Sequence, residues 1–184
     1  MIKHIFTTFL VALVLQTSAQ QFKEDTKFIA VLGSANGLYV GDLFYGGNVI
    51  FEMGFRPIGS DGIISLGGSI GYGNRNYEEA NLSRWSSNRG FAAVRSAFHY
   101  TALNQDKLDV YGGVELGFGI VSTRNTFYNP TTAGLWNYGN RTAGFARLHP
   151  FIGARYYLSN NFALMAETSL ALFNGVNIGA SFDF

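Results

Sequence analysis

The sequence predicts an all-β fold in which eight antiparallel strands close into a barrel. The first observation is alternation: in many segments every second residue is apolar, and side chains alternate between the two faces of a strand. The second is composition, because Gly is abundant at 23 residues, Pro is scarce at 3, and charged residues make up only 14%. The third is that no segment has helical periodicity and that the chain after its start holds no apolar run long enough for a transmembrane helix.

Residues 1–19 have the features of a secretory signal peptide. Lys3 and His4 give a basic start, residues 5–15 form an apolar core, and small residues end at Ala19, after which we expect cleavage. Residues 20–184 then form one barrel domain that begins with a short polar lead-in. The chain has no Cys, so we expect neither a lipoprotein-type lipid attachment nor a disulfide.

The first four strands are expected at residues 28–36, 48–57, 63–72 and 91–101. The first is apolar on both faces, so its inward side is not assigned. In the second, Val49 and Phe51 alternate with Ile50 and Glu52. In the third, large apolar residues alternate with Ser and Gly, which is typical of a strand with one apolar and one polar face.

The last four strands are expected at residues 108–121, 145–158, 162–172 and 176–184. The final strand alternates most clearly. One face carries Val176, Ile178, Ala180, Phe182 and Phe184. The other carries Asn177, Gly179, Ser181 and Asp183. In the sixth strand Pro150 cannot donate a ladder hydrogen bond, so we expect a bulge or weakened pairing there.

Two architectures share this alternation. A soluble barrel of the lipocalin type turns its apolar face inward, and a membrane barrel turns it outward. A water-facing surface should be dense in charged residues, whereas the polar face here is mostly Gly, Ser and Ala, and aromatic residues collect near the strand ends as in interfacial belts. The sequence therefore predicts an eight-stranded antiparallel up-and-down transmembrane β-barrel in a bacterial outer membrane, with both termini periplasmic. Because a free strand edge is very costly in lipid, the eighth strand must pair with the first.

Long connections at residues 39–47, 73–90 and 122–144 alternate with tight turns at 58–62 and 159–161 and a short connection at 102–107, and the last connection, 173–176, is again a tight turn. The loops 73–90 and 122–144 hold side chains that commonly anchor ligands. These are Arg75, Tyr77, Arg84, Trp85, Arg89, Phe127, Tyr128, Trp136, Tyr138 and Arg141. An extracellular ligand bound through these loops is one hypothesis. Contact with the headgroup interface, where Arg meets lipopolysaccharide phosphates, is the interpretation that we favour for most of them.

Two segments carry a resemblance to known proteins. Residues 150–164 read Pro-Phe-Ile-Gly-Ala-Arg-Tyr-Tyr-Leu-Ser-Asn-Asn-Phe-Ala-Leu, and the chain closes on Phe182 and Phe184. The chain resembles the small eight-stranded outer-membrane barrels, which include the transmembrane domain of outer-membrane protein A, and its hairpin looks like those of barrels common in Bacteroidota. The terminal phenylalanines resemble the signal that the barrel-assembly machinery reads. The resemblance implies this machinery, outer-membrane lipid and lipopolysaccharide as partners. The chain ends at the barrel, so we expect no peptidoglycan-binding domain.

The polar face carries charges that a membrane barrel would turn into its lumen. They are Glu52, Arg95, Glu115, Arg147, His149, Arg155 and Glu167, with His99. A buried charge without a partner is very costly, so we expect an ion-pair network. Eight strands leave an interior only just wide enough for side chains, which favours a plug over a gate that passes ions.

The expected function is that of a structural or surface-interaction membrane protein without a large open pore. The alternatives are a narrow channel for ions or small solutes, a lipid-modifying enzyme and a soluble lipocalin-like carrier. We expect no enzyme, because alternation places Ser96 and His99 on opposite faces and no other nucleophile–base pair is visible. We also expect no cofactor or metal site, and a net charge of +1 gives no case for nucleic-acid binding.

Overall fold

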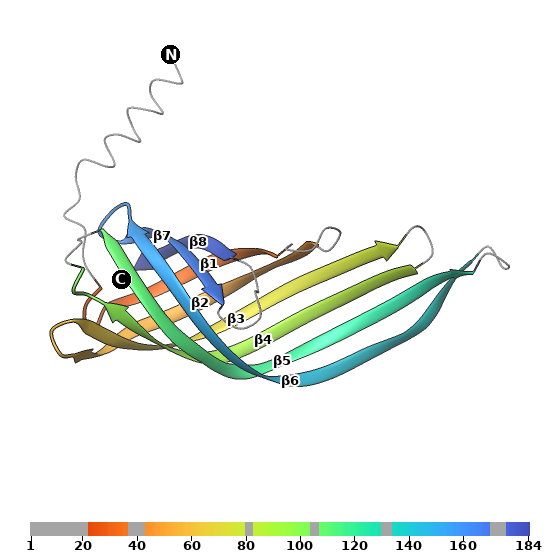
Figure 1. Ribbon diagram of the computed structural model, residues 1–184, viewed down its shortest axis with the longest axis horizontal. Coiled ribbons are helices and arrows are strands. Elements are labelled where there is room, and N and C mark those ends of the chain that lie inside the picture. The colour runs from red at the N-terminus through yellow and green to blue at the C-terminus, as the bar shows by residue number, and fades with distance from the viewer. Residues whose placement is uncertain (1–21, 37–42, 80–82, 104–106, 130–133, 170–175) are drawn as a thin grey trace, which may run out of the picture.

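The computed structural model describes residues 22–36, 43–79, 83–103, 107–129, 134–169 and 176–184. Its eight strands are β1 (Lys27–Asn36), β2 (Leu43–Ile58), β3 (Gly62–Glu79), β4 (Ser83–Tyr100), β5 (Leu108–Asn129), β6 (Gly134–Tyr157), β7 (Phe162–Ser169) and β8 (Val176–Asp183). Each strand pairs antiparallel with the next, and β8 pairs with β1, so the sheet closes (Figure 1). The predicted fold class is confirmed. None of the described segments is a helix that could span a membrane. The predicted signal peptide lies outside the described residues.

The two faces of the sheet differ as a membrane barrel requires. On β1, Phe28, Ala30 and Leu32 are buried inside the barrel, whereas Ile29 and Val31 are 44% and 62% exposed on its outside. This assigns the inward side that the sequence left open. Every other described strand also exposes large apolar side chains, which together form a belt around the barrel. Examples are Phe51, Ile70, Val94, Phe118, Leu148, Leu164 and Ile178.

Strand length differs strongly around the ring. The strands β1, β7 and β8 have 10, 8 and 8 residues, whereas β5 and β6 have 22 and 24. A tilted strand needs about 9–11 residues to cross a bilayer. In Figure 1 the strands β3 to β6 therefore run on well beyond the ends of the short strands. We call this extension the outer wall; it consists of residues 73–79, 83–90, 122–129 and 134–144.

The predicted loops at 73–90 and 122–144 were therefore wrong as loops. Most of their residues are strand, and so are residues 43–47 of the predicted first loop. The ladder continues into the wall, for example from Arg75 to Ser87 and from Thr123 to Arg141, and its β5–β6 pair has one register shift, between Arg124 and Thr126. Outside lipid both faces can be polar, so no alternation of apolar residues marks these strands in the sequence.

The irregularities of the sheet lie elsewhere than predicted. Pro150 pairs in register with Val114, without a bulge. A proline fits a ladder position whose nitrogen points away from the paired strand, and on that other side the described pairing with β7 begins only at Phe151. The register shifts lie between Gly54 and Arg56 on β2 and between Arg124 and Thr126 on β5.

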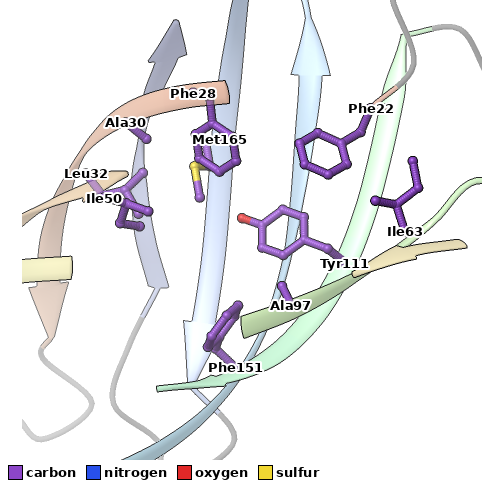
Figure 2. Close-up of a cluster of buried hydrophobic side chains, with 10 residues drawn as sticks. All are labelled: Phe22, Phe28, Ala30, Leu32, Ile50, Ile63, Ala97, Tyr111, Phe151 and Met165. Carbon is purple, nitrogen blue, oxygen red and sulfur yellow. The ribbon is translucent and has the colours of Figure 1, made fainter. Parts of the chain in front are cut away.

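The barrel interior is packed with side chains. Figure 2 shows a cluster of buried apolar residues in which Phe22 and Tyr111 lie together with Phe151 and Met165. Neighbouring strands approach so closely that some inward positions must be Gly. A Cβ atom at Gly179 would collide with the backbone carbonyl oxygen of Val31.

Candidate functional site

Arg95 of β4 lies at the centre of the lumen. Its guanidinium donates from Nε to Glu52 Oε2 at 2.6 Å, from Nη1 to Glu115 Oε1 at 3.2 Å, and from Nη2 to Glu167 Oε2 at 2.9 Å. All four side chains are at most 2% exposed, and the ring of Phe151 lies 4.1 Å from the guanidinium carbon. Because a guanidinium offers five donors in one plane, a single side chain can bind three carboxylates from three different strands.

A second cluster forms around Arg155 of β6, toward the near end of the barrel, by which we mean the end where Phe184 follows β8. Arg155 Nε donates to Asp109 Oδ2 at 2.9 Å, and Nη1 donates to Asp183 Oδ1 at 3.3 Å. Tyr157 adds a hydrogen bond from its hydroxyl to Asp183 Oδ2 at 2.8 Å. The ring of Phe28 lies 4.0 Å from the guanidinium carbon, so this charge is enclosed by acids and aromatic rings.

His99 connects the two clusters. Its Nδ1 lies 2.9 Å from Asp109 Oδ1, and its Nε2 lies 2.9 Å from Glu52 Oε1 and 3.1 Å from Ser65 Oγ. The side chain of His99 is fully buried. The ion pairs therefore form one continuous network through this part of the lumen.

The network continues toward the far end through Glu115. Arg147 Nη2 donates to Glu115 Oε2 at 3.0 Å, and His149 Nδ1 lies 3.2 Å from the same oxygen. Arg147 also lies over the ring of Phe91, with its guanidinium carbon 3.9 Å from the ring centroid. Its side chain is 21% exposed, so the network begins to meet solvent at this level.

The structure brings together all eight lumen residues singled out from the sequence, and it adds two acidic residues that were missed. Asp109 and Asp183 both belong to the network. Their signal was present, because both alternate onto the polar face of their strands. Arg147 and His149 contact Glu115, whereas Glu167 binds Arg95 from across the barrel.

The polar lead-in enters the barrel. Phe22 is 1% exposed, and its ring stacks on His99 with 3.8 Å between ring centroids. The residues behind it dock on the bulge of β2, where Asp25 N donates to Gly54 O at 3.1 Å and Gly54 N donates to Thr26 O at 2.9 Å. The lead-in therefore closes the near end of the lumen.

The lumen also contains a Ser–His–Asp arrangement that the sequence analysis did not find. Ser65, His99 and Asp109 have the contacts of a nucleophile, a base and an orienting acid. However, Ser65 Oγ also hydrogen-bonds to Glu52, and Ser65 and His99 are both 0% exposed. No substrate can reach the hydroxyl in this arrangement. Ser96, which was weighed as a partner of His99, instead donates to the carbonyl oxygen of Ser65 at 2.9 Å.

The inner face of the outer wall, which continues the lumen side of the sheet, carries a row of polar residues. Across four strands, Arg75 pairs with Ser87, Ser87 with Thr123, and Thr123 with Arg141. Arg89 lies two residues from Ser87 on β4, one row nearer the lumen. The structure thus places four of the predicted loop anchors, Arg75, Trp85, Arg89 and Arg141, on one face of a sheet. The others have side chains outside the described part, namely Tyr77, Arg84, Phe127, Tyr128, Trp136 and Tyr138.

The outward face of the wall carries asparagines and Arg124. Asn74 and Asn88 are cross-strand partners, and Asn74 Nδ2 donates to Asn88 Oδ1 at 2.6 Å. Tyr72, at the edge of the apolar belt, donates from its hydroxyl to the same oxygen at 2.8 Å. Arg124 of β5 lies on this face and is exposed. This asparagine ladder follows the last apolar rows, as expected where a barrel leaves the hydrocarbon.

The terminal phenylalanines lie on the lipid-facing side of β8. Phe182 and Phe184 are 51% and 63% exposed, and the rings of Phe184 and Phe51 lie 6.5 Å apart. No group of three or more His, Cys, Asp or Glu side chains within the described segments could hold a metal ion.

Comparison with known proteins identifies the fold. No protein-family model matches the chain, and no curated protein matches it. Among solved structures, Ail, the attachment invasion locus protein of Yersinia pestis, matches with a TM-score of 0.53 at 17% identity, covering 88% of this chain and 100% of Ail. The fold is that of the small eight-stranded outer-membrane barrels. Ail in complex with the heparin analogue sucrose octasulfate matches at 0.52 and 16% identity, with the same coverage.

A third match, the N-terminal β-barrel domain of Pseudomonas aeruginosa OprF, reaches a TM-score of only 0.44 at 16% identity, covering 89% of this chain and 100% of that domain. The resemblance predicted from the sequence is confirmed at the level of fold. The exposed apolar belt agrees with the predicted place in the bacterial outer membrane, because a water-soluble barrel would bury these side chains.

Proposed function

We propose that this protein is a non-conducting outer-membrane barrel with a structural or surface-interaction role carried by its outer wall. One observation supports this most: charged side chains fill the lumen, while four strands continue beyond the apolar belt. In this arrangement the far end is extracellular, and the near end, where Phe22 and Phe184 lie, is periplasmic.

The packing of the lumen supports the absence of an open pore. Ions could pass Arg95 only if its pairs with Glu52, Glu115 and Glu167 separated. Removing one partner of a buried ion pair costs about 3–5 kcal/mol. We therefore expect planar-bilayer recordings of the purified protein to show no conductance steps above background. Regular steps would favour the channel instead.

The enclosure of Ser65 supports a role without catalysis. Mass spectrometry of lipid A from cells with and without expression should give the same species. A new lipid A mass that disappears in Ser65→Ala would favour the enzyme.

Two partners fit the outer surface. The exposed Arg124 and the neighbouring asparagine ladder suit lipopolysaccharide headgroups, because guanidinium groups bind phosphate well. Phe182 and Phe184 at the end of β8 suit recognition by the barrel-assembly machinery.

An extracellular ligand is the third partner in this proposal. Ail has been solved with a sulfated sugar. What we take from Ail is only that a barrel of this fold can bind a molecule from outside the cell.

The outer wall can be shortened without touching the barrel. Replacing residues 123–141 by Asn-Gly joins Ser122 to Thr142, which are already cross-strand partners, so the two-residue turn keeps the register. Cells that express the complete protein should adhere to immobilised polysaccharides or matrix proteins, and cells with the shortened wall should not. The unboiled gel band serves as the control that both variants form barrels. Equal adhesion by both would contradict a role for the wall.

A further inference from the structure

Three arginines give the inner face of the outer wall an excess of positive charge. Arg75 and Arg141 lie at the two ends of one cross-strand row, three strand spacings or about 14 Å apart. Arg89 lies one row nearer the lumen, about 7 Å along its strand. Arg89 and Arg141 are exposed and make no ion pair with any described residue, whereas the lumen arginines are all paired.

Hydroxyl groups lie between these cations. Ser87 and Thr123 occupy the two middle positions of the row. Ser87 is fully buried, and its Oγ has no hydrogen-bond partner among the described residues. Buried polar atoms nearly always have a partner, and this oxygen, on the face that carries the arginines, has bonding capacity that no described residue uses.

Arg75 is held in place before any ligand arrives. Its guanidinium carbon lies 5.6 Å from the ring centroid of Trp85 on the neighbouring strand. The acidic residues of the wall, Glu78 and Glu79, lie beyond the row at the outer tip of β3. The contact with Trp85 therefore positions one of the three guanidinium groups of this face.

We propose that this face binds a sulfated polysaccharide; the inference rests on the proposed function and names the ligand class of the same wall. A guanidinium donates two parallel hydrogen bonds to a sulfate group. Cations separated by about 7–14 Å require several anionic groups on one molecule. The face is an open sheet and not a pocket, so a linear polymer fits it better than a compact anion.

The orientation of the wall selects the source of the ligand. The inner face continues the lumen side of the sheet, so it points over the mouth of the barrel and away from the surrounding lipid. Lipopolysaccharide of the same membrane meets the opposite face, where Arg124 lies. The ligand of the inner face therefore comes from outside the cell.

The test uses the full-length protein in lipid nanodiscs with fluorescent dextran sulfate as the probe and uncharged dextran as the blank. Arg89→Gln and Arg124→Gln form a matched pair, since each removes one exposed charge from opposite faces of the same sheet. Arg89→Gln loses a guanidinium–sulfate contact and should weaken binding about fivefold, whereas Arg124→Gln should weaken it by less than about twofold. Replacing Arg75, Arg89 and Arg141 together by Gln should weaken binding at least about fiftyfold.

Three results would overturn the proposal. They are equal weakening in Arg124→Gln and Arg89→Gln, unchanged binding in the triple variant, and competition by polyglutamate or lipopolysaccharide micelles as strong as that by unlabelled dextran sulfate. The unboiled gel band checks that each variant is folded. If the shortened wall abolishes adhesion while the triple variant binds dextran sulfate normally, the ligand class is wrong and the role of the wall stands.

Discussion

At the scale of single residues, Arg95 holds the most demanding position. Replacing it with Met leaves three carboxylates without their shared partner. Breaking buried pairs of this kind costs about 3–5 kcal/mol. We expect Arg95→Met to lower the urea concentration at which the barrel unfolds in lipid vesicles, with Arg95→Lys intermediate because an ammonium group lacks the planar fork.

The control for Arg95 is Arg124→Met on the exposed outer face, which should change the free energy of unfolding by no more than about 0.5 kcal/mol. An unfolding midpoint of Arg95→Met equal to that of the natural protein would mean that the three pairs do not stabilise the barrel.

A second prediction concerns the close approach of the neighbouring strands β8 and β1. Gly179→Ala places a methyl group against the backbone of Val31, whereas Gly33→Ala on the neighbouring strand meets its nearest atom, Ile178 O, at an ordinary 3.8 Å. Overpacking costs about 1–3 kcal/mol. Gly179→Ala should therefore lose stability and Gly33→Ala should not, as measured by urea unfolding. Equal midpoints would show that the strands can separate to admit the methyl group.

The sequence could predict which charges point inward, because alternation alone decides the face. It could not predict which charges meet. Glu167 pairs with Arg95 across the lumen, three strands away, and such a contact depends on how the closed ring staggers its strands. Phe22 was missed for a related reason: one aromatic residue in a polar lead-in has no periodic signal.

At the scale of elements, the outer wall is where sequence and structure differ most. Apolar alternation stops where lipid stops, so it located the membrane part of β3 to β6 but not their extensions. The extensions are held by backbone pairing, which leaves no apolar pattern in the sequence.

Hydrogen exchange can test the extended strands. Residues 85–90 of β4 have partners on both sides, so their amides should exchange at least about tenfold more slowly than those of a loop. Residues 140–149 of β6 pair only with β5 among the described residues, so slow and fast amides should alternate there. Nuclear magnetic resonance in nanodiscs would measure both. Uniformly fast exchange over residues 85–90 would mean that this segment is a loop and not a strand.

At the scale of the whole molecule, ring closure is the property to measure first. Pairing of β8 with β1 closes the ring of strands, and such barrels resist detergent until heated. An outer-membrane fraction run on a detergent gel should contain a band that migrates faster unboiled than boiled. The absence of a shift, with the protein in the soluble periplasm, would favour the lipocalin-like carrier.

Two groups of side chains close the lumen, so we expect that removing one of them does not open a pore in planar bilayers. Phe22 closes the near end, and the Arg95 cluster closes the middle. Phe22→Ala should therefore lower stability, since a buried phenylalanine truncated to alanine costs about 3–5 kcal/mol, but it should stay electrically silent. Conductance steps in this variant alone would show that Phe22 is the main barrier.

The uneven strand lengths also set a direction of approach. The tall strands β3 to β6 stand on one side of the rim, and the strands β1, β7 and β8 end lower on the other (Figure 1). A long polymer cannot slide in from behind the tall side, so it must arrive over the low side. On a crowded cell surface, a bulky neighbouring protein on the low side would block access to Arg75, Arg89 and Arg141. The same protein behind the outer wall would not. Access of large molecules to the arginines therefore depends on how each barrel is rotated about the membrane normal relative to its neighbours.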